Sequence, residues 1–402
     1  MNNISENFER LPENMTFGLE LEFTGGLTAE KTQEMISKLI EMGLIREGWS
    51  VHSDSSVVDE QGLGAEIVSP PICDDEQTKK ELKIITDCIK NNGGYMSEKV
   101  GGHVHFGLQA LGSDIEVLKN FFKLYTIFEP LLFKLSTGDL DHVRPGCTNY
   151  AKPIQKRLVN VIDKRIDTLS ELMNSLAANV GANPTHYGEN RYYALNIQRI
   201  IEALRHIPED QSMEEFLKKM FDGEPIYDEN GKRLSPTIEM RFRNGSSDPD
   251  EILSGVRMLG GLLVKAHDKE LCKESKIKNL YRSVKKRATY VFDKVLGANR
   301  TDPQYAGLTD EEIMRKKFEQ SPYGDGLISY NMFELFLSVI APNIPEEKIK
   351  ELYDYYQDKL NVEKTNNKES LAESLRAMRE MLLPFVDNME IDNQQRLVLR
   401  AA

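Results

Sequence analysis

The sequence predicts an α+β protein in which helices cover one face of a mainly antiparallel sheet. Two observations lead to this prediction. Several short segments alternate apolar and polar residues with the period of a strand, and the segments between them repeat apolar residues with the period of a helix. The strand-like segments also carry acids, histidines or arginines opposite their apolar residues. The sheet should therefore have one apolar face for the helices and one charged face.

The first strand, TFGLELEF at residues 16–23, shows this pattern most clearly. Its odd-numbered residues from Phe17 to Phe23 are all apolar, while Glu20 and Glu22 lie on the opposite face. The two carboxylates are then roughly 7 Å apart along the strand. Like charges at this spacing are destabilising unless water, a cation or a basic group faces them. The segment alone leaves open a solvated outer face or a cation site.

Capping residues and apolar spacing place the other elements of the first 200 residues. Helices are predicted over 29–42 behind Thr28, from Asp74 or Asp75 to about Lys90, over 113–135 and over 153–178. Strands are predicted within 48–57, where an Asp/Ser turn is also expected, and over 65–68, 101–108 and 194–198. The charged or polar residues of these strands are Glu66, His103, His105 and Asn196. A histidine pair two residues apart is compatible with solvated rings or with a metal or phosphate contact.

The second half begins with an insertion at about 207–236, which contains a short capped helix and an Asn-Gly turn. The strand that follows, TIEMRFRNG, places Glu239, Arg241 and Arg243 on one face. A helix then begins behind Asp248. From about residue 273 the composition becomes more basic and helical. We therefore predict a catalytic domain over 1–272 and a helical C-terminal extension over 273–402.

Composition restricts the class of protein. The chain has 402 residues, 40% of them hydrophobic and 29% charged, with a formal net charge of -13. This acidity argues against a nucleic acid or an anionic membrane as the main partner. The four cysteines have no paired spacing, so neither a zinc motif nor a disulfide framework is indicated. With no apolar run of about 18 residues, we expect a cytoplasmic protein without a signal peptide or membrane span.

The residues of the charged face indicate a chemistry. Four carboxylates, those of Glu20, Glu22, Glu66 and Glu239, provide the hard oxygen ligands that Mg²⁺ prefers, and His105 is a further ligand or a phosphate donor. Arg241 and Arg243 can hold phosphate oxygens. Acids and arginines on one face suit phosphoryl transfer from ATP. Since no glycine-rich phosphate loop is present, a nucleotide would be held through the metal.

Six motifs in this order resemble the amidoligase family, relatives of glutamate-cysteine ligase and glutamine synthetase. They are GLELEF, a Trp with HSDSSV, AEIVSPP, GGHVHFGL, RYYALNI and TIEMRFRNGSSDP, and they span about residues 15–263. The resemblance implies a glutamine-synthetase-like sheet and an ATP-dependent carboxylate-amine ligase, in which ATP phosphorylates a carboxylate and an amine displaces the phosphate. The 207–236 insertion and the tail past 273 depart from the family pattern, which leaves the substrates open.

The resemblance also implies roles for individual residues. Glu20, Glu22, Glu66, His105 and Glu239 match metal-binding positions, and Glu239 and Arg241 are implied to be catalytic. The residues implied to bind the cofactor are Arg241, Arg243, His103, Arg144 and Asn196. Asp54 and Arg191 match motif positions of less certain role.

Other classes of protein could use the same types of residue. A metal-dependent hydrolase could use His103, His105 and the glutamates around zinc. A nucleotide kinase, or a binding module that kept the fold without the chemistry, is a further alternative. For the ligase, the substrates expected are an amino acid, a peptide or a protein terminus, together with an amine. The sequence does not indicate an oligomeric state.

Overall fold

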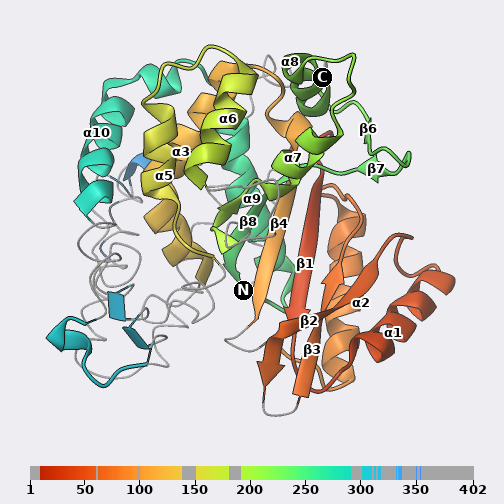
Figure 1. Cartoon of the computed structure of the whole chain (residues 1–402). Helices are drawn as coiled ribbons and strands as arrows, with labels where there is room; N and C mark the ends of the chain where they lie inside the picture. Colours follow the sequence, from red (N-terminus) through yellow and green to blue (C-terminus); the bar gives the residue numbers. More distant parts are fainter. Residues whose placement is uncertain are drawn as a thin grey trace.

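The computed structural model describes residues 10–59, 62–96, 100–137, 151–180, 192–290 and 301–309, with a few positions between 312 and 354. Its centre is a six-stranded sheet with the order β2-β3-β1-β4-β8-β5 (Figure 1). The strands are β1 (Phe17–Phe23), β2 (Ser50–Asp59), β3 (Gly62–Val68), β4 (Gly101–Gly107), β5 (Leu195–Asn196) and β8 (Thr237–Asn244). All five pairings are antiparallel, so the predicted α+β class and antiparallel sheet are confirmed.

Helices pack against the apolar face of this sheet. The longer ones are α1 (Ala29–Glu41), α2 (Glu76–Asn91), α3 (Ile115–Thr137) and α9 (Pro249–Ala266), whereas α10 (Ser275–Tyr290) packs against other helices. Figure 1 shows α2 and α9 behind the central strands β1 and β4. The apolar residues of β1, from Phe17 to Phe23, are at most 3% exposed and belong to the same core as residues of α2, α3 and α9. The alternation in β1 therefore decides which face the helices cover.

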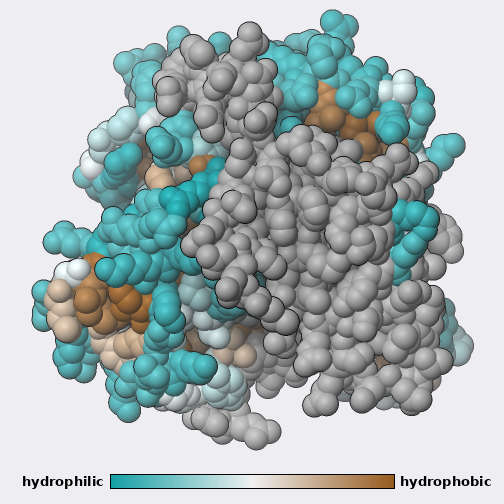
Figure 2. Space-filling model, turned by 180° about the vertical axis from the view of Figure 1, so that it is seen from behind, coloured by the Kyte–Doolittle hydropathy of each residue, from teal (hydrophilic) through white to brown (hydrophobic). Residues whose placement is uncertain are grey.

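The distribution of polar and apolar residues on the surface is that expected for amphipathic helices, which turn their apolar side to the core. Seen from behind, the described part of the molecule is mostly hydrophilic, with hydrophobic residues gathered in small patches (Figure 2). Thr28 accepts a hydrogen bond from the Lys31 N–H at the start of α1, and Asp75 does the same for Thr78 at the start of α2. Both predicted helices are confirmed with their caps. Among the described residues, no helix has the length and hydropathy needed to cross a bilayer.

Three predicted elements were wrong in their extent. The single helix over 153–178 is two helices, α5 (Gln155–Ile162) and α6 (Leu169–Val180). The second begins at a capping box, in which Thr168 and Glu171 exchange hydrogen bonds between side chain and main chain. The expected Asp/Ser turn in 48–57 is part of β2, which continues to Asp59 with a register irregularity after Ser53.

The strand over 194–198 is also shorter than predicted. Only Leu195 and Asn196 pair with β8, and Gln198 begins helix α7 (Gln198–Ala203). The side chain of Asn196 accepts a hydrogen bond from the Gln198 N–H at 2.8 Å, which turns the chain out of the sheet. As a result, α7 begins only two residues after Asn196, the last residue of β5.

Arg243 does not share a face with Glu239 and Arg241, as the simple alternation predicted. The pairing of β4 with β8 changes register between Gly102–Arg243 and Val104–Met240, which indicates a bulge in β8. Arg243 is 2% exposed, packs against Gly255 of α9 and donates to the Glu251 carbonyl at 3.2 Å. Burial lowers its pKa to about 10. The bulge therefore turns Arg243 toward the helices.

The predicted insertion forms a compact unit. It contains α8 (Met213–Phe221), which begins at the predicted capping box of Ser212 and Glu215, and a hairpin of β6 (Ile226–Tyr227) with β7 (Arg233–Leu234). Beyond residue 273, α10 packs against α3 and α5, and the Tyr281 hydroxyl donates to Asp163 at 3.1 Å. Most of the predicted extension past residue 290 lies outside the described residues, and the boundary near 273 stays a prediction.

The close approach of β3 to β1 leads to a stability prediction. A Cβ atom at Gly64 would overlap the main-chain oxygen of Phe23 and contact Val57. We expect Gly64→Ala to lower the free energy of unfolding in urea by about 3 kcal/mol, because neither strand backbone can move without losing its pairing. Gly93→Ala is the control: its Cβ would meet open space, and its φ of 89° should cost only about 1 to 2 kcal/mol. Equal losses would contradict this interpretation of Gly64.

Candidate metal centre

The register of the sheet gathers the predicted metal ligands. Glu20 of β1 lies opposite His103 of β4, and Glu22 lies opposite Glu66 of β3. On the other side, His105 of β4 lies opposite Glu239 of β8. Residues that face each other across antiparallel strands have neighbouring side chains. Three pairings therefore build one cluster, which we call the carboxylate cluster: Glu20, Glu22, Glu66, His103, His105 and Glu239.

Glu20 is the centre of the hydrogen bonds in this cluster. Its Oε2 lies 2.6 Å from Nδ1 of His103, and its Oε1 lies 2.7 Å from Nε2 of His105. All three side chains are at most 8% exposed. Burial would raise the pKa of Glu20, but the hydrogen bonds from the two histidines outweigh it and hold the pKa well below its ordinary value. Glu20 is thus a buried carboxylate that accepts an N–H from each ring.

Glu239 is stabilised by β8 and β5. Its carboxylate forms an ion pair with Arg241 and accepts a hydrogen bond from Nδ2 of Asn196 at 2.7 Å. The Arg241 side chain is 15% exposed, so the pair is largely shielded from water. Burial acts to raise the pKa of Glu239, and the charge of Arg241 overcomes it and lowers the pKa. Arg241 therefore favours the ionised form of Glu239, and Asn196 and Arg241 together fix its orientation.

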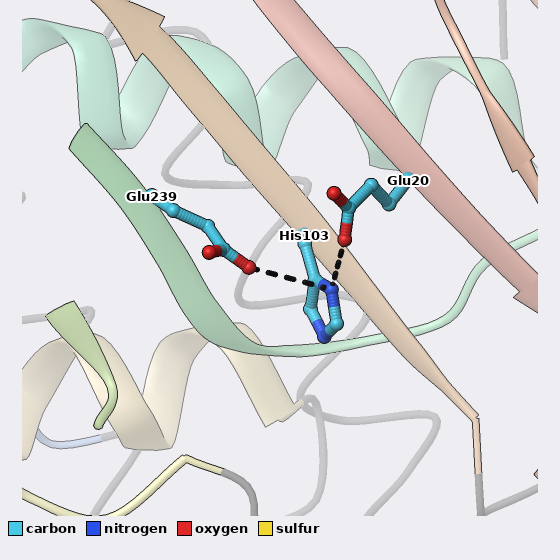
Figure 3. A group of neighbouring side chains, drawn as sticks. All are labelled: Glu20, His103 and Glu239. Carbon is cyan, nitrogen blue, oxygen red and sulfur yellow. Dashed lines mark hydrogen bonds and ion pairs between the residues drawn. The ribbon is translucent and has the colours of Figure 1, made fainter. Parts of the chain in front are cut away.

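Two groups of side chains in the cluster are close enough to hold a cation. Glu20, His103 and Glu239 offer ligand atoms within 4.8 Å of one another, and so do Glu22, Glu66 and His103. Figure 3 shows Glu20 and Glu239 approaching the same His103 ring nitrogen from both sides. Oε1 of Glu239 is 3.6 Å from that Nδ1 atom. The prediction placed His103 with the cofactor, whereas the geometry also places it between both cation groups.

The tautomer of His103 decides which group it can serve. Because its Nδ1 faces the ionised Glu20, this nitrogen carries the proton, and the lone pair of a neutral ring is then on Nε2. That atom lies 3.5 Å from Oε1 of Glu22. His103 therefore presents its free lone pair to the group with Glu22 and Glu66. To serve the other group, the ring must give up its bond to Glu20.

Glu66 differs from the other three glutamates. It has no hydrogen-bond partner among the described residues, while Glu22 accepts the Gly101 N–H at 2.5 Å. Burial, followed by the negative charges of Glu20 and Glu22, raises the pKa of Glu66 to about 9. In the absence of a cation, Glu66 is thus protonated at neutral pH. A divalent ion beside Glu22 would replace this proton.

Arg199 is a site residue that the sequence analysis missed. It follows β5 on α7, is about half exposed, and its Nη2 lies 3.4 Å from Oε1 of Glu20. Thr237 was missed as well, and its hydroxyl contacts Nδ1 of His105 at 3.1 Å. The predicted strand over 194–198 ended one residue before Arg199, so the sequence analysis assigned this residue no place at the site. The signal that could have located it is Asn196, a residue type whose side chain often accepts a main-chain N–H two residues later and so ends a strand.

The remaining predicted residues are placed as follows. Asp54 of β2 is partly buried, and its negative charge contributes to raising the pKa of Glu66. Arg243 lies against α9, away from the cluster. Arg144 and Arg191 fall outside the described residues.

The raised pKa of Glu66 leads to a stability prediction for the metal-free protein. Its folded pKa is about 9, above the ordinary value of 4.5, so its contribution is fully present below about pH 4.5 and is lost as the pH rises through 9. In EDTA, we expect the free energy of unfolding to fall between pH 5 and 9, and Glu66→Gln to reduce this slope. Glu47→Gln, at an exposed position, should keep the wild-type slope. A slope unchanged by Glu66→Gln would contradict the assignment.

Comparison with known proteins agrees with this site. No curated protein matches the chain. A family described as putative amidoligase enzyme matches residues 13–205, which include the five strands from β1 to β5 and thus five of the six motifs. β8 lies beyond the match, but the sheet register brings its Glu239 opposite His105. Residues 13–205 are therefore similar to the amidoligase family, which confirms the resemblance of the sequence motifs over that part of the chain.

Proposed function

We propose that the protein is an ATP-dependent carboxylate-amine ligase that forms an amide or peptide bond through an acyl phosphate. The observation that carries the proposal is the carboxylate cluster, in which four glutamates converge beside Arg241 on one buried face of the sheet. The family match supports an amidoligase activity. The antiparallel order of the six strands supports the finer proposal of a glutamine-synthetase-like sheet.

The side chains of the cluster fit Mg²⁺. Each of the two cation groups contains two carboxylates and one histidine, and Mg²⁺ prefers hard oxygen ligands at sites it shares with substrate phosphates. Glu66 is further support, since burial and then the negative charges of Glu20 and Glu22 raise its pKa to about 9, an effect that a nearby cation would oppose. When bound, the ions would supply positive charge that offsets the negative charge of the phosphates. Glu20 and Glu239 would hold one ion, and Glu22 and Glu66 the other.

The reaction then needs two displacements. An oxygen of the substrate carboxylate attacks the γ-phosphorus of ATP, and ADP leaves. The amine nitrogen attacks the carbonyl carbon of the acyl phosphate, inorganic phosphate leaves, and the amine releases one proton. Arg241, oriented by its ion pair with Glu239, stabilises the negative charge on the phosphoryl oxygens. The substrates we propose are an amino acid, a peptide or a protein terminus and an amine, in the cytoplasm.

A zinc hydrolase is a weaker proposal. Catalytic zinc sites typically have three protein ligands, such as three histidines or two histidines and one glutamate. Here both candidate groups share one histidine, and the other ligands are glutamates. Zinc that remains with the purified protein, and turnover without ATP, would favour hydrolysis.

Nucleotide binding gives the first prediction of function. We expect Mg-ATP at about 100 times its dissociation constant to add about 2.7 kcal/mol to the free energy of unfolding, and so to raise the melting temperature. ATP with EDTA should give a much smaller shift, because the glutamates repel the phosphates unless a cation lies between them. Glu239→Gln is the variant control and should reduce the shift. Equal shifts with and without EDTA would show that the nucleotide does not depend on the metal.

Product formation is the decisive test. We expect the wild type, incubated with ATP, Mg²⁺ and a cell extract, to form a product whose mass is the sum of two components less one water. Arg241→Lys should lower its rate by roughly a hundredfold, since lysine cannot reproduce the planar two-point contact with phosphate. Thermal melting of this variant must show that it is folded. ATP hydrolysis or phosphorylation without any condensed product would contradict ligation.

A further inference from the structure

A cavity of about 640 Å³ adjoins one end of the carboxylate cluster. Glu20 and His105 form part of its wall, together with the start of β1 and η2 (Leu108–Ala110), the turn that follows β4. The opposite wall comes from α7 and from segment 207–236, through residues 223–225 and 233–236. The segment that departs from the family pattern therefore borders the same space as the cluster. It also lies beyond the family match, which ends at residue 205.

Several contacts hold segment 207–236 against the sheet. Gly223, with a φ of 83°, ends α8, and a Cβ atom there would lie 3.2 Å from the side chain of Gln109. Gln109 in turn donates to Thr16 at 2.7 Å, and Asp222 accepts the Ser113 N–H at 3.2 Å. The segment thus contacts Gln109 and Ser113 after β4, and Gln109 links it to Thr16 just before β1. Its wall of the cavity is part of the folded structure.

This wall carries positive charge, whereas the carboxylate cluster is negative. Arg199 and Arg233 both line the cavity. Arg199 makes an ion pair with Glu20, and Arg233 has no hydrogen-bond or ion-pair partner among the described residues. Two guanidinium groups beside an acidic cluster, in a chain with a formal charge of -13, favour a ligand whose negative charge extends away from the metal.

The other residues of the wall are apolar. Met220, Pro225 and Leu234 line the cavity on the side of segment 207–236. The volume lies within the range of small-molecule sites, which combine apolar walls with a few charged groups. A nucleoside triphosphate matches both features of the cavity: its flat base suits the apolar wall, and its phosphates suit the charged groups. A small dicarboxylate would leave the apolar wall without a contact.

We infer that this cavity binds the nucleotide, and that segment 207–236 supplies its outer wall, with Arg233 and Arg199 contacting the phosphates. The inference rests on the proposed function. The base lies against the apolar wall, and the phosphates extend toward Glu20 and His105. Arg233 is thus a binding residue of this chain outside the residues that carry the family match.

The test compares two neighbouring cations of the hairpin. Arg233 lines the cavity, whereas Lys232, one residue earlier and exposed, does not. We expect Arg233→Ala to weaken Mg-ATP binding about tenfold or more in calorimetry, as for loss of a charged hydrogen bond. Adenosine binding should be nearly unchanged, Lys232→Ala should bind Mg-ATP as the wild type does, and Arg233→Lys should restore part of the loss. Because Arg233 is exposed, the variants should melt like the wild type.

The outcomes separate the inference from the proposed function. If the wild type binds Mg-ATP and Arg233→Ala binds it equally well, the inference fails and the proposed function stands. If Arg233→Ala leaves the KM for ATP unchanged and raises that for the carboxylate substrate, the cavity holds that substrate and the inference is overturned. If the wild type binds Mn²⁺ but no Mg-ATP, both fail.

Discussion

The repulsion among four glutamates on one buried face is the constraint on which this structure depends. The fold resolves it in four ways. Glu20 accepts N–H groups from two histidines, Glu239 pairs with Arg241, and Glu22 accepts a main-chain N–H. Glu66 instead keeps a proton, because its pKa is raised to about 9. The partners of Glu20 and Glu239 thus favour their ionised forms, and Glu66 is neutral until a cation takes the place of its proton.

Much of this arrangement follows from the sequence. Alternation placed Glu20 and Glu22 on the face opposite Phe17 and Phe23, and the caps of α1, α2, α8 and α9 were readable from their first residues. The family motifs pointed to Glu66, His105 and Glu239. In the structure these residues come close to the other members of the cluster, because side chains on one face of an antiparallel sheet become neighbours once the strands are in register.

What the sequence did not predict depends on local irregularities and on tertiary contacts. A bulge in β8 reverses the direction of Arg243, and no spacing rule reveals where a strand gains a residue. The break between α5 and α6 is an exception, since the capping box of Thr168 and Glu171 marks it in the sequence itself. Arg199 reaches Glu20 only because the chain turns into a helix two residues after β5. The burial of Glu20 on β1 was also not predicted, because it depends on hydrogen bonds from His103 and His105 on β4, 83 and 85 residues later in the chain.

The position of His103 between two cation groups makes them unequal. An imidazole ring has one lone pair to give unless it is doubly deprotonated, so two ions that both seek this ring compete for it. Filling one group lowers the ring's affinity for an ion in the other, and the second ion must complete its coordination shell elsewhere. Oxygen atoms of an incoming substrate are the obvious source. If both groups bind an ion, the ion without the ring would therefore take its remaining ligands from a bound substrate, and its affinity would depend on that substrate.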